Sequence, residues 1–284
     1  MKRIIGLVLL AWGAIGVCMA GSHDENWPVR EQQTIEKTVP LTGEPMRLVV
    51  DNVSGYVHVK ATNGPNVRIT AHKTVRAETP SDLEASREVK LTIEGKPGSV
   101  DVYYDAPWRC NGDRRCTSDH RRFYEVRFDL DIEAPHTART VVSTVNGGEL
   151  TLDGTGDFDA GNVNGPIRMT NISGSGDAHT VNGPITIHFA KNPAGSCRFK
   201  TVNGSLDAYF PHDLSADLLF KTFNGEIFSD FDVDARVVPA AVTEHRGGKY
   251  IYRSNRASGG RAGKGGPELS FDTLNGSIRL HREQ

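Results

Sequence analysis

The chain contains little that could perform chemistry. Among its 284 residues there are 4 cysteines, and the sequence has no phosphate-binding P-loop, HExxH zinc motif, GxSxG nucleophile motif or dinucleotide fingerprint. Its serine, histidine and cysteine residues lie in no recognisable nucleophile context. These absences argue against the common classes of hydrolase, kinase and dehydrogenase. We therefore predict a protein that is not an enzyme and that uses no cofactor.

A large excess of charge of either sign is also missing. The 33 basic residues are balanced by 35 acidic ones, which gives a formal net charge of −2. Such a composition has no general attraction for nucleic acid, so we predict no nucleic-acid partner. Beyond the N-terminus, no apolar run is long enough to span a bilayer, so we expect no transmembrane segment in the mature protein.

The one long apolar run lies at the start of the chain, in MKRIIGLVLLAWGAIGVCMA. Typical features of a secretory signal peptide are the positive beginning at Lys2 and Arg3, the apolar stretch, and the small residues Cys18 and Ala20 at the −3 and −1 positions of a cleavage site. We expect residues 1–20 to be cleaved, which would deliver the protein to the periplasm, the cell surface or the medium. An uncleaved anchor is a minor alternative.

Residues 21–34 are mostly polar, and we expect them to form a flexible leader before the folded domain. Cys18 raises the alternative of a lipoprotein, in which a cysteine becomes lipidated. The residue before it is Val17, whereas lipidation signals have a small residue there, so lipidation through Cys18 is a minority interpretation. Either interpretation places the mature chain outside the cytoplasm.

Three cysteines would remain after cleavage. Cys110 and Cys116, in RCNGDRRC, are predicted to form a disulfide in an oxidising compartment. Closing so short a loop would stabilise the fold by only about 2 kcal/mol. Cys197 is then left over, as a small buried apolar residue or in an unidentified pair, and the spacing of the three cysteines does not fit a zinc site.

The most informative pattern is an Asn-Gly pair that occurs six times in similar surroundings, at intervals of 18, 18, 21, 21 and 51 residues. A period near 20 is typical of solenoids, in which successive repeats stack on one another. The long last interval leaves room for an insertion. The predicted turn ladder consists of Asn146, Gly147, Asn164, Gly165, Asn182, Gly183, Asn203, Gly204, Asn224, Gly225, Asn275 and Gly276.

The residues around each pair repeat too. Thr precedes most of the Asn residues by two positions, an apolar residue precedes each directly, and Ile or Leu usually follows three positions later. Alternation of polar and apolar residues is typical of a half-buried strand. We predict that Asn side chains stack at a corner, with glycine at positive φ. We also predict that one column points into the core: Val145, Val163, Val181, Val202, Phe223 and Leu274.

These patterns predict an all-β protein, a β-solenoid resembling a parallel β-helix, with rungs of about 18–21 residues. The N-terminal strands are less regular, and residues 80–90 could form one short helix or an irregular loop. Insertions are expected at residues 106–122 and 245–268, the second with a mobile Gly-rich end. We predict a single domain over residues 35–284.

The series of copies resembles the bacterial putative-adhesin family of unknown function, adhesin-like domains of uncharacterised envelope proteins. The matching features are LVVDNVSGYVHVKAT, a strand that ends in IEAP, the run of TVNGxI copies and the closing LSFDTLNGSIRL. The resemblance covers about residues 35–284 and implies a β-solenoid envelope domain, without an established ligand or catalytic residues. The insertion between Cys110 and Cys116 departs from this pattern.

A basic insertion is the strongest candidate for a binding site. Guanidinium groups bind phosphate and carboxylate through paired hydrogen bonds, and neighbouring aromatic rings could stack on a ligand. We consider an anionic envelope glycan, a lipid head group or another envelope protein as partners, with a solvated loop balanced by nearby acids as the alternative. The candidate anion-binding residues are Arg109, Arg114, Arg115, Arg121 and Arg122.

Two further interpretations concern the acidic bends. GTGDFD and SGSGD resemble parts of a calcium-binding nonapeptide, but the copies are never in tandem as such a site requires. A carbohydrate-active enzyme, a polysaccharide lyase or hydrolase on a β-helix, would need paired carboxylates. Candidates are Asp153, Asp157, Asp159 and Asp177. Solvated turns explain both patterns, so no metal and no catalytic residue is predicted.

The sequence thus favours an exported envelope protein that acts as an adhesin-like binding or scaffold module through its surfaces. A carbohydrate-active enzyme on the same fold is one alternative. An accessory or sensor protein of an envelope stress pathway is another, which no residue of the sequence tests. Ligand and oligomeric state are not encoded in any motif described above.

Overall fold

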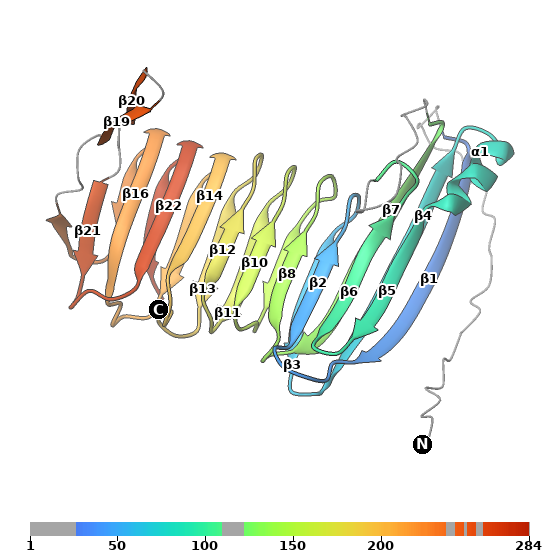
Figure 1. The fold of residues 1–284 in the computed structure, drawn as a ribbon, viewed down its shortest axis with the longest axis horizontal. Helices are drawn as coiled ribbons and strands as arrows, with labels where there is room; N and C mark the ends of the chain where they lie inside the picture. The colour runs from blue at the N-terminus through green and yellow to red at the C-terminus, as the bar shows by residue number, and fades with distance from the viewer. Residues whose placement is uncertain (1–26, 110–121, 237–241, 247–248, 254–257, 284) are drawn as a thin grey trace.

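The computed structural model describes residues 27–109, 122–236, 242–246, 249–253 and 258–283. These residues form two large mixed β-sheets, a two-stranded hairpin and one short α-helix, so the prediction of an all-β protein is confirmed. The two sheets lie face to face along the length of the molecule (Figure 1). None of the described helices is long and apolar enough to cross a membrane.

Sheet A has ten strands. In spatial order they are β1 (Val29–Pro40), β4 (Asn66–Ala77), β7 (Tyr124–Pro135), β3 (Val57–Thr62), β9 (Leu150–Asp153), β11 (Ile167–Ile172), β13 (Ile185–Phe189), β15 (Leu206–Phe210), β23 (Ile278–Arg282) and β17 (Ile227–Ser229). The pairs from β7 to β17 are parallel, whereas β1, β4 and β7 pair antiparallel.

Sheet B has eleven strands. In spatial order they are β5 (Lys90–Lys96), β6 (Ser99–Asp105), β2 (Arg47–Asp51), β8 (Arg139–Ser143), β10 (Phe158–Gly161), β12 (Gly176–His179), β14 (Cys197–Asn203), β22 (Glu268–Asn275), β16 (Ala216–Asn224), β21 (Ser258–Ala262) and β18 (Val233–Arg236). The separate hairpin joins β19 (Val242–Arg246) to β20 (Lys249–Arg253).

The chain alternates between the sheets, and we call one strand of sheet B, the following corner and the next strand in sheet A a rung. The rungs β8–β9, β10–β11, β12–β13 and β14–β15 follow one another in space as in sequence. Equivalent residues are in register, so that Ile167 pairs with Leu150 on one side and with Ile185 on the other. A parallel stack of this kind explains why the same residues recur at the same positions.

Phenylalanine rings fill much of the space between the sheets. On the sheet B side, the Phe199 and Phe271 rings are 5.2 Å apart, and those of Phe271 and Phe220 are 5.7 Å apart. On the sheet A side, Phe189 stacks on Phe210 at 4.9 Å. Each fully buried ring contributes about 1.5–3 kcal/mol. Because equivalent positions lie above one another, one apolar residue per repeat produces a continuous core.

Cys197 lies in this core. It is a free cysteine with an exposed fraction of 2%, and burial raises the pKa of its thiol. It therefore behaves as the small apolar residue that the sequence predicted. Cys110 and Cys116 lie outside the described residues, as does the predicted signal peptide.

The column predicted to point inward is wrong by one residue. Val181 and Leu274, which directly precede Asn residues, have exposed fractions of 39% and 47%, whereas Thr180 and Thr273 are buried. The Thr201 hydroxyl donates a hydrogen bond to the carbonyl oxygen of Gly183 in the neighbouring rung, at 2.9 Å. This bond satisfies both buried polar groups and allows Thr to occupy the inner face.

The predicted role of the corner glycines also needs correction. Gly204 does not have the positive φ expected from its sequence context. A Cβ at this position would instead overlap the carbonyl oxygen of Gly183, because the corners lie directly above one another. Glycine is thus required for close approach between rungs rather than for a left-handed turn.

The N-terminal end is covered by long strands and a helix. The strand β1 starts at Val29, so residues 29–34 are not the flexible leader that the sequence suggested. The helix α1 (Pro80–Ala85) begins at an N-cap on Thr79, which forms a capping box with Asp82. The 3₁₀ turn η1 (Ser86–Glu88) follows and leads into β5.

The segment 245–268, predicted to be an insertion with a mobile end, contains a strand of the large sheet. The strand β21 pairs antiparallel with both β16 and β18. A Cβ at Gly260 would overlap the side chain of Val233, so the glycine allows β21 and β18 to lie together. The prediction missed this strand because its sequence, SGGRA, has no apolar alternation.

Candidate functional site

The outer face of sheet A is a polar surface that extends over ten strands. Its cross-strand rows contain one outward side chain from each strand. One row runs Glu36, Thr70, Asp131, His58, Thr151, Arg168, Thr186, Asp207, Arg279 and Phe228. Because the strands lie about 4.8 Å apart, a row of this kind presents hydrogen-bonding groups at regular steps.

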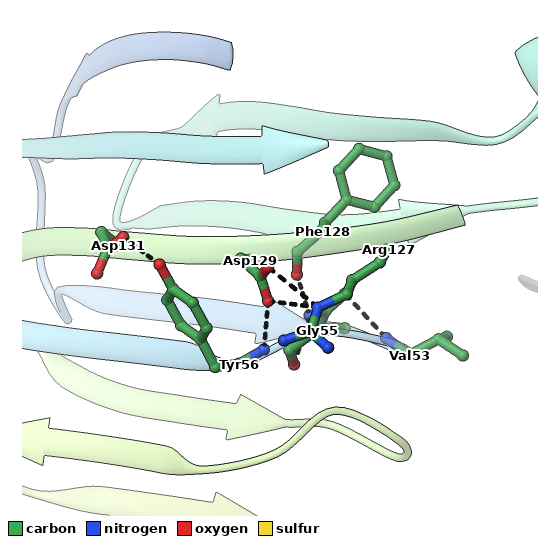
Figure 2. A network of polar contacts seen from close by, with 8 residues as sticks. Val53, Gly55, Tyr56, Arg127, Phe128, Asp129 and Asp131 are labelled. Carbon is green, nitrogen blue, oxygen red and sulfur yellow. Dashed lines mark hydrogen bonds and ion pairs between the residues drawn. The ribbon is translucent and has the colours of Figure 1, made fainter. Parts of the chain in front are cut away.

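A network of polar contacts organises the N-terminal part of this face (Figure 2). The backbone N–H of Tyr56 donates to Asp129 Oδ1 at 3.0 Å, and Arg127 Nε donates to both oxygens of that carboxylate, at 2.8 and 3.0 Å. The Tyr56 hydroxyl donates to Asp131 Oδ2 at 2.9 Å. These contacts join the start of β3 to β7 and fix the tyrosine ring.

The tyrosine ring also stacks on a histidine. The rings of Tyr56 and His58 lie 4.2 Å apart at an interplanar angle of 20°, and His58 Nδ1 is 3.2 Å from Asp131 Oδ1. Burial, with the Asp131 hydrogen bond and charge, raises the pKa of the Tyr56 hydroxyl to about 12. The phenol thus remains protonated at neutral pH and keeps its bond to Asp131.

Two hollows adjoin this network. One, of about 460 Å³, is lined by Gln32, Thr34, Tyr56, His72 and Asp129, among others, and Thr34 Oγ1 lies 3.2 Å from His72 Nδ1. The other, of about 290 Å³, shares Gln32, Thr74 and Asp129 with the first. Together they form a shallow polar depression across β1, β4 and β7, beside the ring pair of Tyr56 and His58.

A second group of rings lies further along the same face. The rings of His188 and Tyr209 stack at 4.0 Å, and those of Tyr209 and His281 stack at 4.4 Å. His188 Nδ1 is 3.1 Å from Glu283 Oε1. Across the strands, the two ring groups are separated by the step from β3 to β13, three strand spacings or about 14 Å, and His188 lies two residues beyond the row of His58.

This arrangement suits a ligand rich in hydroxyl groups. Aromatic rings offer an apolar surface, while the adjacent amides, carboxylates and guanidinium groups offer directed donors and acceptors. Within the described residues, no group of three or more His, Cys, Asp or Glu side chains could hold a metal ion. The face thus combines apolar ring surfaces with directed donors and acceptors.

The predicted turn ladder lies along the corner between the two sheets. Asn182 Nδ2 donates to Asn164 Oδ1 at 2.8 Å, and Asn203 Nδ2 donates to Asn182 Oδ1 at the same distance. The Asn275 side chain bonds to Asn203, and the Asn224 side chain bonds to Asn275, so the last copy in sequence is next to last in space. The corner glycines Gly165, Gly183, Gly204, Gly276 and Gly225 form a parallel column that continues from Gly148, whereas Gly147 lies against Gly55.

The arginines in the described part of the basic insertion contact other residues of the fold. Arg109 donates to the Tyr104 carbonyl and to Asp51 Oδ2, both within hydrogen-bonding distance, and is half-buried. The Arg122 guanidinium lies 3.6 Å from the centre of the Trp108 ring. Arg114, Arg115 and Arg121 lie outside the described residues. The anion site predicted there remains a prediction.

The candidate carboxylates occupy several surfaces. Asp153 Oδ1 accepts hydrogen bonds from Thr170 and Asn171. Asp157 Oδ1 accepts one from the backbone of Ser175 in the next bend, at 2.9 Å. Asp159 and Asp177 are side by side on β10 and β12, on the outer face of sheet B. Asp153 and Asp157 thus bind groups of the fold itself.

The sequence reasoning did not find the network of Tyr56, Asp129 and Asp131. Its members lie on strands separated by about 73 residues in sequence, and they meet because β3 pairs with β7. The only available signal was the polar set of YEVRFDLDIEAP, whose alternation predicted the strand but not what it faces.

No family model and no curated protein matches the chain. A putative cell adhesion protein from Clostridium sporogenes has a similar structure, with 9% identity, a TM-score of 0.45 and coverage of 88% of this chain and 100% of the other. A putative adhesin from Bacteroides fragilis has 7% identity, a TM-score of 0.39 and coverage of 88% and 97%. A putative lipid binding protein from Parabacteroides distasonis has 10% identity and a TM-score of 0.26, with coverage of 88% and 97%. Putative adhesins are thus among the structural neighbours, as the sequence resemblance suggested, but at these scores they assign no ligand.

Proposed function

We propose that the protein is a non-enzymatic binding module of the cell envelope whose outer sheet A face binds an extended, hydroxyl-rich polymer such as a glycan. In this proposal residues 1–20 direct export, and the stacked rungs form one β-solenoid over residues 35–284 that acts as a rigid platform. The carrying observation is the pair of ring groups on one polar face, about 14 Å apart across the strands. Between them, the rows of polar side chains provide donors and acceptors.

The ring groups support an extended ligand rather than a small one. The hollows of about 460 and 290 Å³ near Tyr56 adjoin one another and share lining residues, and the His188, Tyr209 and His281 stack lies on the same face. A ligand that contacts both groups must run along the long axis of the molecule. A linear polymer meets this requirement, and its repeating units match repeating strands.

The proposal is tested by replacing one ring in each group. Tyr56→Ala and Tyr209→Ala should each weaken binding to an envelope polysaccharide, identified on a glycan array, by about tenfold, which corresponds to about 1.4 kcal/mol. The physical reason is the loss of apolar ring edges that pack against sugar rings, because the faces of the Tyr209 ring are already covered by His188 and His281. Affinity would be measured by titration calorimetry on the exported, full-length mature protein.

Tyr103→Ala is the matched control. Tyr103 is an outward tyrosine on the opposite sheet, and its hydroxyl also bonds to a carboxylate, that of Glu94, at 3.4 Å. Its replacement should leave the affinity unchanged. Equal affinities for Tyr56→Ala, Tyr209→Ala and Tyr103→Ala would contradict the proposed face, as would the lack of any glycan ligand for the wild type.

A further inference from the structure

A hollow beside the C-terminal rungs lies away from the ring pair of Tyr56 and His58. It has a volume of about 490 Å³ and is lined, among others, by His212, Ser215, Phe231, Asp232, Lys264 and Arg282. Four chain segments meet here: the loops that follow β15, β17 and β21, and the end of β23. His212 also lines the neighbouring hollow of about 390 Å³ beside His188.

The hollow follows from the order of the rungs. After β15 the chain passes over the position of one rung to reach β16, and the rung β22–β23 later occupies that position. The passing loop, residues 211–215, therefore spans two rung spacings, or about 10 Å, instead of one. This wider crossing separates the loop from its neighbours and places His212 and Ser215 at the rim.

A glycine turn forms one wall and presents a lysine. Gly263 and Gly265 have φ values of 56° and 79°, in the left-handed region, and Lys264 lies between them. The turn is held by Ser215, whose hydroxyl accepts from the Lys264 backbone N–H at 3.0 Å and donates to the Gly265 carbonyl at 2.8 Å. Among the described residues, the Lys264 ammonium makes no hydrogen bond or ion pair.

An arginine that also lines the hollow is held by the fold. One Arg282 Nη donates to the carbonyl of Asp230 at 3.1 Å, and the guanidinium lies 5.1 Å from the centre of the Phe231 ring. Only one of the guanidinium donors is used in this bond, so others remain for a ligand. Phe231 is buried, with an exposed fraction of 8%, and gives the arginine a rigid support.

We propose that this hollow is a second binding site, which takes an oxyanion, phosphate or carboxylate, carried on a hydroxyl-rich molecule such as an acidic sugar. Lys264 provides a point charge, and Arg282 provides paired donors that match the geometry of either oxyanion. His212 adds a ring nitrogen between the two hollows. The proposal is independent of the sheet A face, because it uses other residues and another ligand group.

The acidic residues of the hollow favour a carrier with hydroxyl groups over a bare anion. Asp213 and Asp232 also line it, and Asp213 Oδ1 accepts from Asn192 at 3.1 Å. Two carboxylates offset the charges of Lys264 and Arg282, so the site is not a general attractor of anions. Carboxylate oxygens accept hydrogen bonds from sugar hydroxyls, and they would thus select a charged sugar.

The test compares glucose 6-phosphate, glucuronate and glucose as ligands of the full mature chain, by titration calorimetry. We expect at least one of the two charged sugars to bind at least tenfold more tightly than glucose. Preference for glucose 6-phosphate would identify a phosphate site, and preference for glucuronate a carboxylate site. Equal affinity for all three sugars, or binding of none, would overturn the proposal.

Variants then locate the site. Lys264→Ala and Arg282→Ala should each weaken binding of the preferred charged sugar about tenfold, because each removes one charged contact. Lys221→Ala and Arg198→Ala are matched controls on the outer face of sheet B and should leave the affinity unchanged. Lys264 is exposed, so its variant should fold normally, and wild-type affinity in Lys264→Ala would refute the assignment. Tyr56→Ala should not affect this titration, which separates the two sites.

Discussion

At both ends of the molecule, the spatial order of the rungs departs from their order in sequence. At the N-terminal end, β2–β3 lies between β6–β7 and β8–β9. At the C-terminal end, β22–β23 lies between β14–β15 and β16–β17. The N-terminal rung comes first in the chain, so later strands can add on both sides of it. The C-terminal rung comes last and must enter a position that the chain has already passed.

The two ends also differ in how they close. At the N-terminal end, Lys37 and Lys73 of sheet A reach across and donate to the carbonyl oxygens of Ile93 and Val89, at 2.7 and 3.0 Å, at the outermost strand of sheet B. Charged groups that occupy an edge strand prevent it from pairing with another chain. At the C-terminal end, β21 and β18 extend sheet B alone, and sheet A ends at β17 with Ile227 39% and Phe228 48% exposed.

The comparison indicates that the N-terminal end is capped. At the C-terminal end, the rung β22–β23 is expected to pair with its neighbouring strands late in folding. Pairing β22 with β14 brings together residues about 72 positions apart in sequence, whereas β12 and β14 are about 21 apart. Contacts between distant residues form more slowly, because more chain entropy is lost. We therefore expect the stability of the C-terminal half to depend on its last residues.

A chain that ends at Pro267 should show the largest effect. It lacks β22 and β23, so β14 and β16 each lose a parallel partner, as do β15 and β17. We expect loss of cooperative unfolding in the C-terminal half, measured by circular dichroism on heating and by hydrogen exchange. Removal of residues 27–40, which deletes only the edge strand β1, is the comparison at the other end and should leave a folded protein. If a chain ending at Pro267 melts like the full chain, the C-terminal half does not depend on β22 and β23 for its stability.

The second largest effect is expected at a corner in the centre of the stack. In Gly204→Val, the new side chain overlaps the backbone of Gly183, and neither rung can move without breaking register. We expect a loss of about 3 kcal/mol in the free energy of unfolding, measured by urea titration. Gly64→Val is the control, because no atom lies within 4 Å of a Cβ at Gly64. A similar loss in both variants would show that the close approach of the corners is not the cause.

Much of the fold could be predicted from the repeat. The common period located the rungs, and the alternation in RLVV, HVKAT and YEVRFDL located strands that the structure has. The order of the rungs could not be predicted, because the corner at Asn275 has the same residues as the other corners. Local sequence determines that a rung forms, whereas its position depends on which free edge it meets.

The outer face of sheet A was missed for a related reason. Binding surfaces are made of outward polar residues, and alternation gives the same signal whether these residues contact a ligand or water. Tyr56 and Asp131 come within hydrogen-bonding distance only when β3 and β7 pair. The basic insertion attracted attention because its arginines are adjacent in sequence, yet Arg109 is bound to Asp51.

The smallest effect is expected at the column of apolar residues before each Asn, which was wrongly predicted to point into the core. Two reciprocal variants test which residue, Thr201 or Val202, belongs to the core. In both Thr201→Val and Val202→Thr the shape of the side chain is nearly kept. The first removes the buried hydroxyl that bonds to the Gly183 carbonyl, so we expect a loss of about 1–3 kcal/mol in the free energy of unfolding. The second changes a partly exposed position and should stay within about 0.5 kcal/mol of the wild type. If urea titration gave the larger loss for Val202→Thr, the apolar residue before each Asn would belong to the core after all. The hydrogen bonds between rungs would then not explain why Thr recurs two positions before most of the Asn residues.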